Sequence, residues 1–137
     1  MIILDTNVLS ELMKAAPAAS VSEWVASQPA SRLFITAITQ AEILYGIGLL
    51  PMGRRHDSIA TAAQAMFNED FSDRILAFNS DAATAYADIA VVRRNKGRPI
   101  SQFDAQIAAI ARSTGAALAT RNIGDFEGCE IELINPW

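Results

Sequence analysis

The sequence predicts a single α/β domain built on a parallel sheet, and three observations lead to this prediction. Five short apolar runs alternate along the chain with longer helical stretches, which is typical of βαβ units. These runs are apolar on both faces, as buried parallel strands are. The 137 residues match the usual size of one domain and can bury a core, so we expect residues 1–137 to form one unit.

The first half of the chain is expected to contain two strands and four helices. Prolines separate the first two helices and end the third, and the fourth helix is rich in alanine. In chain order, these elements are strand Ile2–Leu4, helices Asn7–Lys14 and Ser20–Gln28, strand Arg32–Thr36, and helices Gln40–Leu50 and Gly53–Asp70.

The second half is expected to contain three strands and two helices. A glycine follows each helix, which is a common signal for a helix end. In chain order, these elements are strand Arg74–Phe78, helices Asp81–Lys96 and Gln102–Thr114, and strands Ala116–Thr120 and Glu130–Ile134.

Composition narrows the class of protein. The formal charge of −4, from 11 basic and 15 acidic residues, argues against a nonspecific nucleic-acid coat but permits a local basic patch or a metal-mediated phosphate site. The hydrophobic fraction of 51% leaves room for a self-association surface or a partner groove. The single Cys129 cannot form an intramolecular disulfide, and we find neither a secretory signal nor a membrane span, so we expect a cytoplasmic protein.

Four acids are candidates for a common site. Ligands of open parallel sheets bind beyond the carboxyl ends of the strands. Asp5 follows the first expected strand, Glu42 lies in the first turn of the helix after the second, and Asp125 lies in the loop after the fourth. Asp104 lies on the helix that leads to the fourth strand, so whether it faces the same edge depends on the tilt of that helix.

Each acid also has a purely structural interpretation. Asp5 could cap the helix near Asn7, and Asp125 could close an Asx turn with Asn122. "TQAE" and "SQFD", which end at Glu42 and Asp104, both fit a capping box. From spacing alone, caps and metal ligands both remain open.

Convergence of the four acids would require compensation. Phe103 and Ile107 flank Asp104 on the expected inner side of its helix, where an acid needs a partner. Four close carboxylates would repel one another, and a hard cation such as Mg²⁺ with retained waters is the usual compensation. The lone His56 and Cys129 cannot build a zinc site.

Basic residues form two clusters and one isolated position. Arg54 and Arg55 open the alanine-rich helix, whereas Arg121 lies in "TRNIGDF" beside Asp125. The remaining cluster ends a helix, where cations favour the helix dipole, yet both clusters could instead contact a phosphate backbone, and Arg121 could hold an acid or approach a phosphate. The arginines of the remaining cluster are Arg93, Arg94 and Arg98.

Six segments in this order resemble the PIN-domain ribonucleases of the VapC toxin family, close to the FitB-like branch. They are "MIILDTNVLSEL", "TQAEILYGI", "LLPMGRR", "DAQIAAIAR", "ATRNIGDFEG" and "LINPW". The resemblance implies a PIN-like three-layer α/β/α fold with a parallel five-stranded sheet. One departure is Asn79, where many relatives have an acid, which leaves the capping of the following helix in doubt.

The resemblance also implies a site and a function. Asp5, Glu42, Asp104 and Asp125 would bind Mg²⁺ or Mn²⁺ and hydrolyse RNA to 5′-phosphate and 3′-hydroxyl ends. The chain would be the toxin of a type II toxin–antitoxin system, a homodimer whose acidic cleft a small VapB- or FitA-like antitoxin blocks. The supporting polar residues would be Thr6, Asn7, Thr120 and Asn122.

Two other functions remain possible from the acids alone. A receiver-like phosphoryl-transfer domain also groups acids with Mg²⁺ at strand ends, but it needs a lysine there, and Lys14 and Lys96 fall in expected helices. A non-catalytic binding module would use the acids only as caps and would show no site-specific binding of Mg²⁺ or Mn²⁺.

Overall fold

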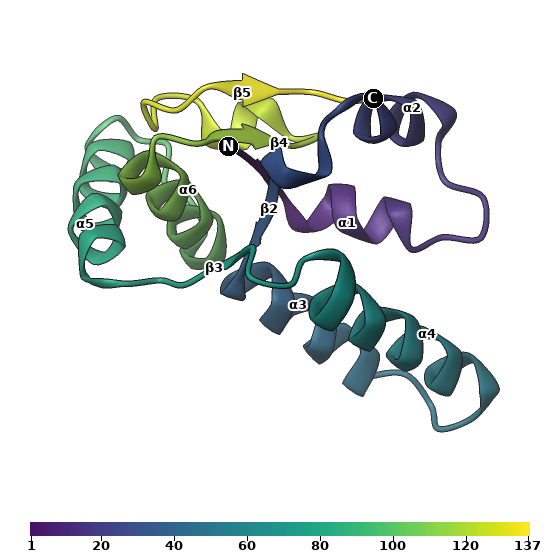
Figure 1. Ribbon diagram of the computed structural model, residues 1–137. Coiled ribbons are helices and arrows are strands. Elements are labelled where there is room, and N and C mark those ends of the chain that lie inside the picture. Colours follow the sequence, from purple (N-terminus) through teal and green to yellow (C-terminus); the bar gives the residue numbers. More distant parts are fainter.

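A computed structural model describes residues 1–137 as a three-layer α/β/α arrangement around a parallel sheet (Figure 1). The strands lie in the order β3-β2-β1-β4-β5, and every neighbouring pair is parallel. Their bounds are β1 Ile2–Leu4, β2 Leu33–Thr36, β3 Ile75–Leu76, β4 Ala117–Ala119 and β5 Leu133–Ile134. The fold class expected from the sequence is therefore confirmed.

Six α-helices connect and cover the strands. They are α1 Thr6–Leu12, α2 Ala19–Ser27, α3 Ala37–Gly48, α4 Arg54–Ala65, α5 Ser80–Asn95 and α6 Gln102–Thr114. Helices α5 and α6 pack against each other, while α3 and α4 form a pair that extends away from the sheet (Figure 1). None of the helices combines the length and the apolar character that a membrane span requires.

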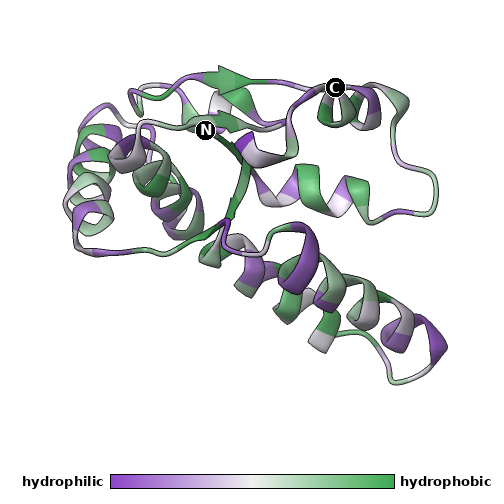
Figure 2. Ribbon diagram, viewed as in Figure 1, coloured by the Kyte–Doolittle hydropathy of each residue, from purple (hydrophilic) through white to green (hydrophobic).

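The two faces of the sheet bury separate apolar clusters. Along β1, Ile2 and Leu4 point into a cluster built with α1 to α4, whereas Ile3 points into a cluster built with α5 and α6. This alternation follows from the two-residue period of a strand. Figure 2 shows the corresponding apolar colouring along the strands of the sheet.

Helix ends are set by local polar contacts. Asn79 caps α5, because its side chain accepts a hydrogen bond from the Ala82 N–H at 3.0 Å. This contact settles the doubt raised by the missing acid at this position. Gly115 adopts a left-handed conformation (φ 71°) at the end of α6, which turns the chain directly into β4.

Several expected boundaries are wrong. Helix α3 begins at Ala37 rather than Gln40, since Thr36 is the true cap and accepts from the Thr39 N–H at 3.1 Å. The helix expected over 53–70 is divided into α4 and the π-helical turn Met66–Asp70. Strands β3 and β5 are only two residues long, because fewer backbone pairs form at the sheet edges than the apolar runs suggest.

Candidate active site

The end of β1 delivers Asp5 to the carboxyl edge of the sheet. The backbone N–H of Asp5 still pairs with the Ala119 carbonyl of β4 at 2.9 Å, and α1 starts at the next residue. Asp5 is also the N-cap of α1, as its Oδ1 accepts from the Thr6 N–H at 2.8 Å. The cap interpretation is thus correct, but it leaves the second carboxylate oxygen available for other contacts.

Polar groups from "DTN" and "TRN" hold that second oxygen. The Thr120 hydroxyl donates to Asp5 Oδ2 at 2.8 Å, and the Asn7 side-chain amide donates to the same oxygen at 3.3 Å. The Asn122 N–H in turn donates to the Thr120 hydroxyl at 3.1 Å. Asp5 is 5% exposed and makes no ion pair, so neutral donors orient it without cancelling its charge.

Glu42 comes from α3 and is held by a chain of threonine hydroxyls. The Thr6 hydroxyl donates to Glu42 Oε1 at 2.9 Å and lies 2.9 Å from the Thr39 hydroxyl. Because a hydroxyl has one proton, Thr39 donates to Thr6 in this arrangement. The capping-box interpretation of Glu42 is wrong, since the helix begins at Ala37 and places Glu42 in its second turn.

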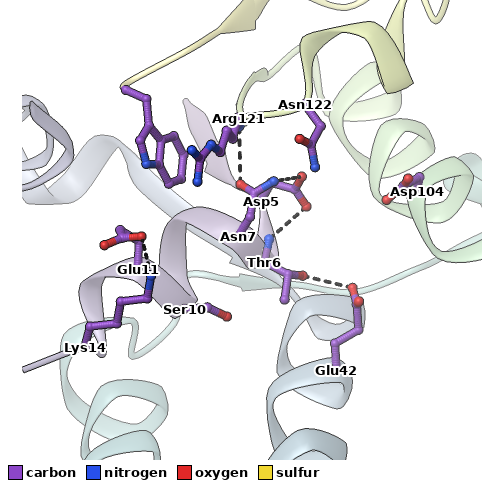
Figure 3. Close-up of a pocket in the computed structure, with 11 residues that line it drawn as sticks. Asp5, Thr6, Asn7, Ser10, Glu11, Lys14, Glu42, Asp104, Arg121 and Asn122 are labelled. Atoms are coloured by element: carbon purple, nitrogen blue, oxygen red, sulfur yellow. Dashed lines mark hydrogen bonds and ion pairs between the residues drawn. The ribbon is translucent and has the colours of Figure 1, made fainter. Parts of the chain in front are cut away.

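Asp104 comes from the first turn of α6 and reaches the same pocket as Asp5 and Glu42. Ser101 caps this helix and accepts from the Asp104 N–H at 3.2 Å, so the residue combines a cap-box position with a place in the pocket. Both Phe103 and Ile107 were expected on the inner side of this helix. Ile107 is indeed buried, but Phe103 is 53% exposed, so the expectation is wrong for Phe103. Figure 3 shows Asp104 on a separate helix, on the other side of the pocket from Asp5.

Asp125 lies in the 3₁₀ turn Ile123–Phe126 and does not line the pocket. Its N–H donates to the Asn122 carbonyl at 3.0 Å, and its side chain is exposed. Phe126 is 1% exposed and anchors this turn in the core. Of the four acids, the pocket therefore combines Asp5, Glu42 and Asp104, and Asp125 stands at its margin.

Asp5, Glu42 and Asp104 are shifted toward the protonated form. Burial is the main cause that raises the pKa of Asp5 to about 6. The hydrogen bonds from Thr120 and Thr6 lower this pKa, whereas the negative charges of Asp104 and Glu42 raise it by smaller amounts than burial does. Burial also raises the pKa of Glu42 and that of Asp104, and the neighbouring acids act in the same direction. The site thus stores unfavourable negative charge.

These acids fit a hydrated divalent cation. The pocket has a volume of about 460 Å³, and its oxygen-rich lining suits a hard ion. No three Asp, Glu, His or Cys side chains are close enough to hold one ion by themselves. A divalent cation in this pocket would therefore be held by one or two carboxylates and would retain several waters.

The pocket contains residues that the sequence analysis missed. Glu11 is buried, and its pKa is lowered by its bond from Lys14 at 2.9 Å and by the Ala18 N–H. Lys14 lies beyond the end of α1 and lines the pocket, contrary to its expected place within a helix. The sequence signal that could have indicated this ion pair is the i,i+3 spacing of Glu11 and Lys14 shortly after "DTN". Ser10 and Trp137 complete the missed set.

The basic residues divide into buried, paired and free groups. Arg93 is buried and donates to the carbonyls of Arg98 at 2.7 Å and Asp125 at 2.8 Å, among others, so its guanidinium is engaged within the protein. Arg98 pairs with Glu127 at 3.1 Å. The remaining candidates are exposed: Arg54, Arg55, Arg94 and Arg121.

Comparisons with known proteins point to one family. A family model described as "PIN domain" matches residues 2–127. "VapC ribonuclease Y4jK" of Sinorhizobium fredii is 37% identical and covers 100% of this chain and 98% of its own length. "Toxin FitB" of Neisseria gonorrhoeae is 34% identical, and the match covers 100% of this chain and 99% of the relative's own length. The crystal structure of FitAcB from Neisseria gonorrhoeae has a TM-score of 0.94 at 34% identity, again covering 100% of this chain and 99% of that one.

Proposed function

Since this chain belongs to the PIN-domain family, we propose that it is a metal-dependent endoribonuclease and the toxin of a type II toxin–antitoxin system. The observation that carries the proposal is the pocket in which Asp5, Glu42 and Asp104 meet from three separate elements. The names of two relatives of this chain, a VapC ribonuclease and a toxin, support the same activity.

In this proposal, Asp5 and Asp104 hold Mg²⁺ or Mn²⁺, Glu42 completes the site within the pocket, and Asp125 completes it from the margin. When bound, the ion supplies positive charge at the scissile phosphate and makes the attacking water more acidic. In the hydrolysis, the oxygen of a water bonds to phosphorus while the bond from phosphorus to the 3′ oxygen breaks; the water loses a proton to solvent and the departing 3′ oxygen takes one up. The products are therefore a 5′-phosphate and a 3′-hydroxyl, and the RNA 2′-hydroxyl takes no part as a nucleophile.

The chain's own polar groups prepare this reaction. Thr120, Asn7 and the Thr6 N–H fix both oxygens of Asp5, and the Thr6 hydroxyl fixes Glu42. Because these donors already point at the carboxylates, little reorganisation is needed when a cation arrives. The raised pKa of Asp5 means that binding a cation also displaces a proton at mildly acidic pH.

The receiver-like alternative is disfavoured by the surroundings of Lys14. That lysine lines the pocket, but its Nζ is 2.9 Å from Glu11 Oε1, so it is engaged in an ion pair. A module whose acids serve only as caps is disfavoured by Glu42, which caps no helix and instead accepts from Thr6. Neither alternative explains why three acids of raised pKa share one pocket.

A cytoplasmic antitoxin is the expected partner. A groove of about 800 Å³ adjoins the pocket and shares Thr6, Ser10, Lys14 and Glu42 with it. Apolar side chains of α3, including Ile43 and Ile47, line the groove, so a bound antitoxin segment there would also reach the acids. The FitAcB structure supports such an assembly by analogy.

Cleavage assays with the purified protein test the proposal. RNA cleavage should stop in EDTA and return with Mg²⁺ or Mn²⁺, and the products should carry 5′-phosphates. Products that end in 2′,3′-cyclic phosphates would contradict the hydrolytic mechanism. Cleavage that continues in EDTA would contradict the role of a metal.

A further inference from the structure

Arg121 is the one cation of the acidic pocket whose charge is not paired within the protein. The other cationic lining residue, Lys14, is bound to Glu11. The five ion pairs of the chain all involve other residues, and only the backbone N–H of Arg121 makes a hydrogen bond, to Asn7 Oδ1. Its guanidinium therefore has five donors available for a ligand.

Trp137 holds this guanidinium in place. The guanidinium carbon of Arg121 lies 5.2 Å from the centre of a Trp137 ring, which is a cation–π distance. Trp137 is the only hydrophobic residue that lines the pocket, and it packs against the apolar cluster of Ile2 and Leu4. The ring is thus anchored by the core and presents a face to Arg121, which restricts a side chain that would otherwise be mobile.

The pocket consequently has an unpaired cation on one side and unpaired acids on the other. Figure 3 shows Arg121 and the Lys14–Glu11 ion pair on one side of Asp5, and Asp104 on the other. An RNA strand brings a phosphate at every nucleotide, so a strand that places one phosphate at the acids brings another near the cationic side. A guanidinium binds phosphate through two parallel N–H bonds, and Arg121 is the group with free donors there.

We propose that Arg121 binds an RNA phosphate next to the scissile one, and that Trp137 is a positioning residue that holds the guanidinium for this contact. The inference rests on the proposed function, because it assumes that RNA is the substrate. It assigns Trp137 no direct contact with RNA, since Arg121 covers the ring face.

Binding of a single-stranded RNA oligonucleotide in EDTA, measured over a range of salt concentrations, separates these roles from cleavage. Arg121→Gln should weaken binding by about fivefold and reduce the salt dependence by about one phosphate contact. The matched control is Arg32→Gln, because Arg32 is exposed and precedes β2, at the opposite edge of the sheet. The control should bind like wild type.

A double-mutant cycle tests the role of Trp137. Trp137→Leu should weaken binding about as much as Arg121→Gln, the double variant should lose little more, and Trp137→Phe should restore most of the affinity because it keeps an aromatic face. Thermal melts show whether each variant is folded. If Trp137→Leu is unfolded, Trp137→Phe still tests the positioning role, because it keeps an aromatic face. Fully additive losses would show that Trp137 contacts RNA itself and would overturn its positioning role.

Two further outcomes distinguish this inference from the proposed function. If wild type cleaves RNA and Arg121→Gln binds as Arg32→Gln does, the phosphate contact is wrong and the proposed function stands. If wild type neither binds nor cleaves RNA with any divalent cation, both are wrong.

Discussion

The raised pKa of Asp5 gives the metal-free protein a predictable dependence of stability on pH. Asp5 has a pKa of about 6 when folded, mainly because it is buried, against about 4 in an unfolded chain. Between these values the native state binds more protons than the unfolded state, so stability falls as pH rises. The difference corresponds to about 3 kcal/mol, present below pH 4 and lost as pH rises through 6.

Chemical denaturation in EDTA at several pH values between about 4 and 7 measures this loss. Asp5→Asn should flatten the dependence markedly, although the raised pKa values of Glu42 and Asp104 will leave some slope in the same direction. Asp81→Asn is the control, since Asp81 is exposed in the first turn of α5, far along the chain from the pocket residues. If Asp5→Asn keeps the full wild-type slope, the reasoning about a buried, unpaired carboxylate is refuted.

Three other outcomes follow from the site and the fold. Arg93→Gln should destabilise the protein by about 3 kcal/mol, because several carbonyls lose a buried charged donor, whereas the exposed neighbour Arg94→Gln should change it by less than about 0.5 kcal/mol in the same denaturation assay. Asp104→Asn should melt at the wild-type temperature or higher in EDTA and gain much less from Mg²⁺ than wild type does; a lower melt in EDTA with no effect of Mg²⁺ on either protein would make Asp104 only a cap. Light scattering after size exclusion should show a homodimer, as the exposed apolar side chains of Tyr45 and Val91 suggest, and a monomer at micromolar concentration would count against it.

Most of the site was predictable because its residues lie where strands end. Asp5 and Thr120 follow β1 and β4 directly, and two adjacent parallel strands bring their ends together whatever the helices do. The alternation of apolar runs and helices likewise predicted the parallel sheet. For these features, short-range sequence patterns determine the position in space.

The remaining features depended on contacts that spacing does not encode. The cap at Thr36 rather than Thr39 moved the start of α3, and with it the interpretation of Glu42, because either threonine can serve as an N-cap and the capping-box pattern singled out Thr39. Arg93 and Arg94 are adjacent in one cluster, but only the helix rotation decides that Arg93 is buried. Trp137 reaches the pocket through tertiary packing alone.

The most direct test of the central claim is to sequence RNA 5′ ends in cells after induction of the protein. If the pocket of Asp5, Glu42 and Asp104 hydrolyses RNA, wild type should generate new 5′-monophosphate ends at defined positions, and Asp104→Asn should generate none at equal protein level. The same new ends in both strains, or no new ends with folded wild-type protein, would contradict the account.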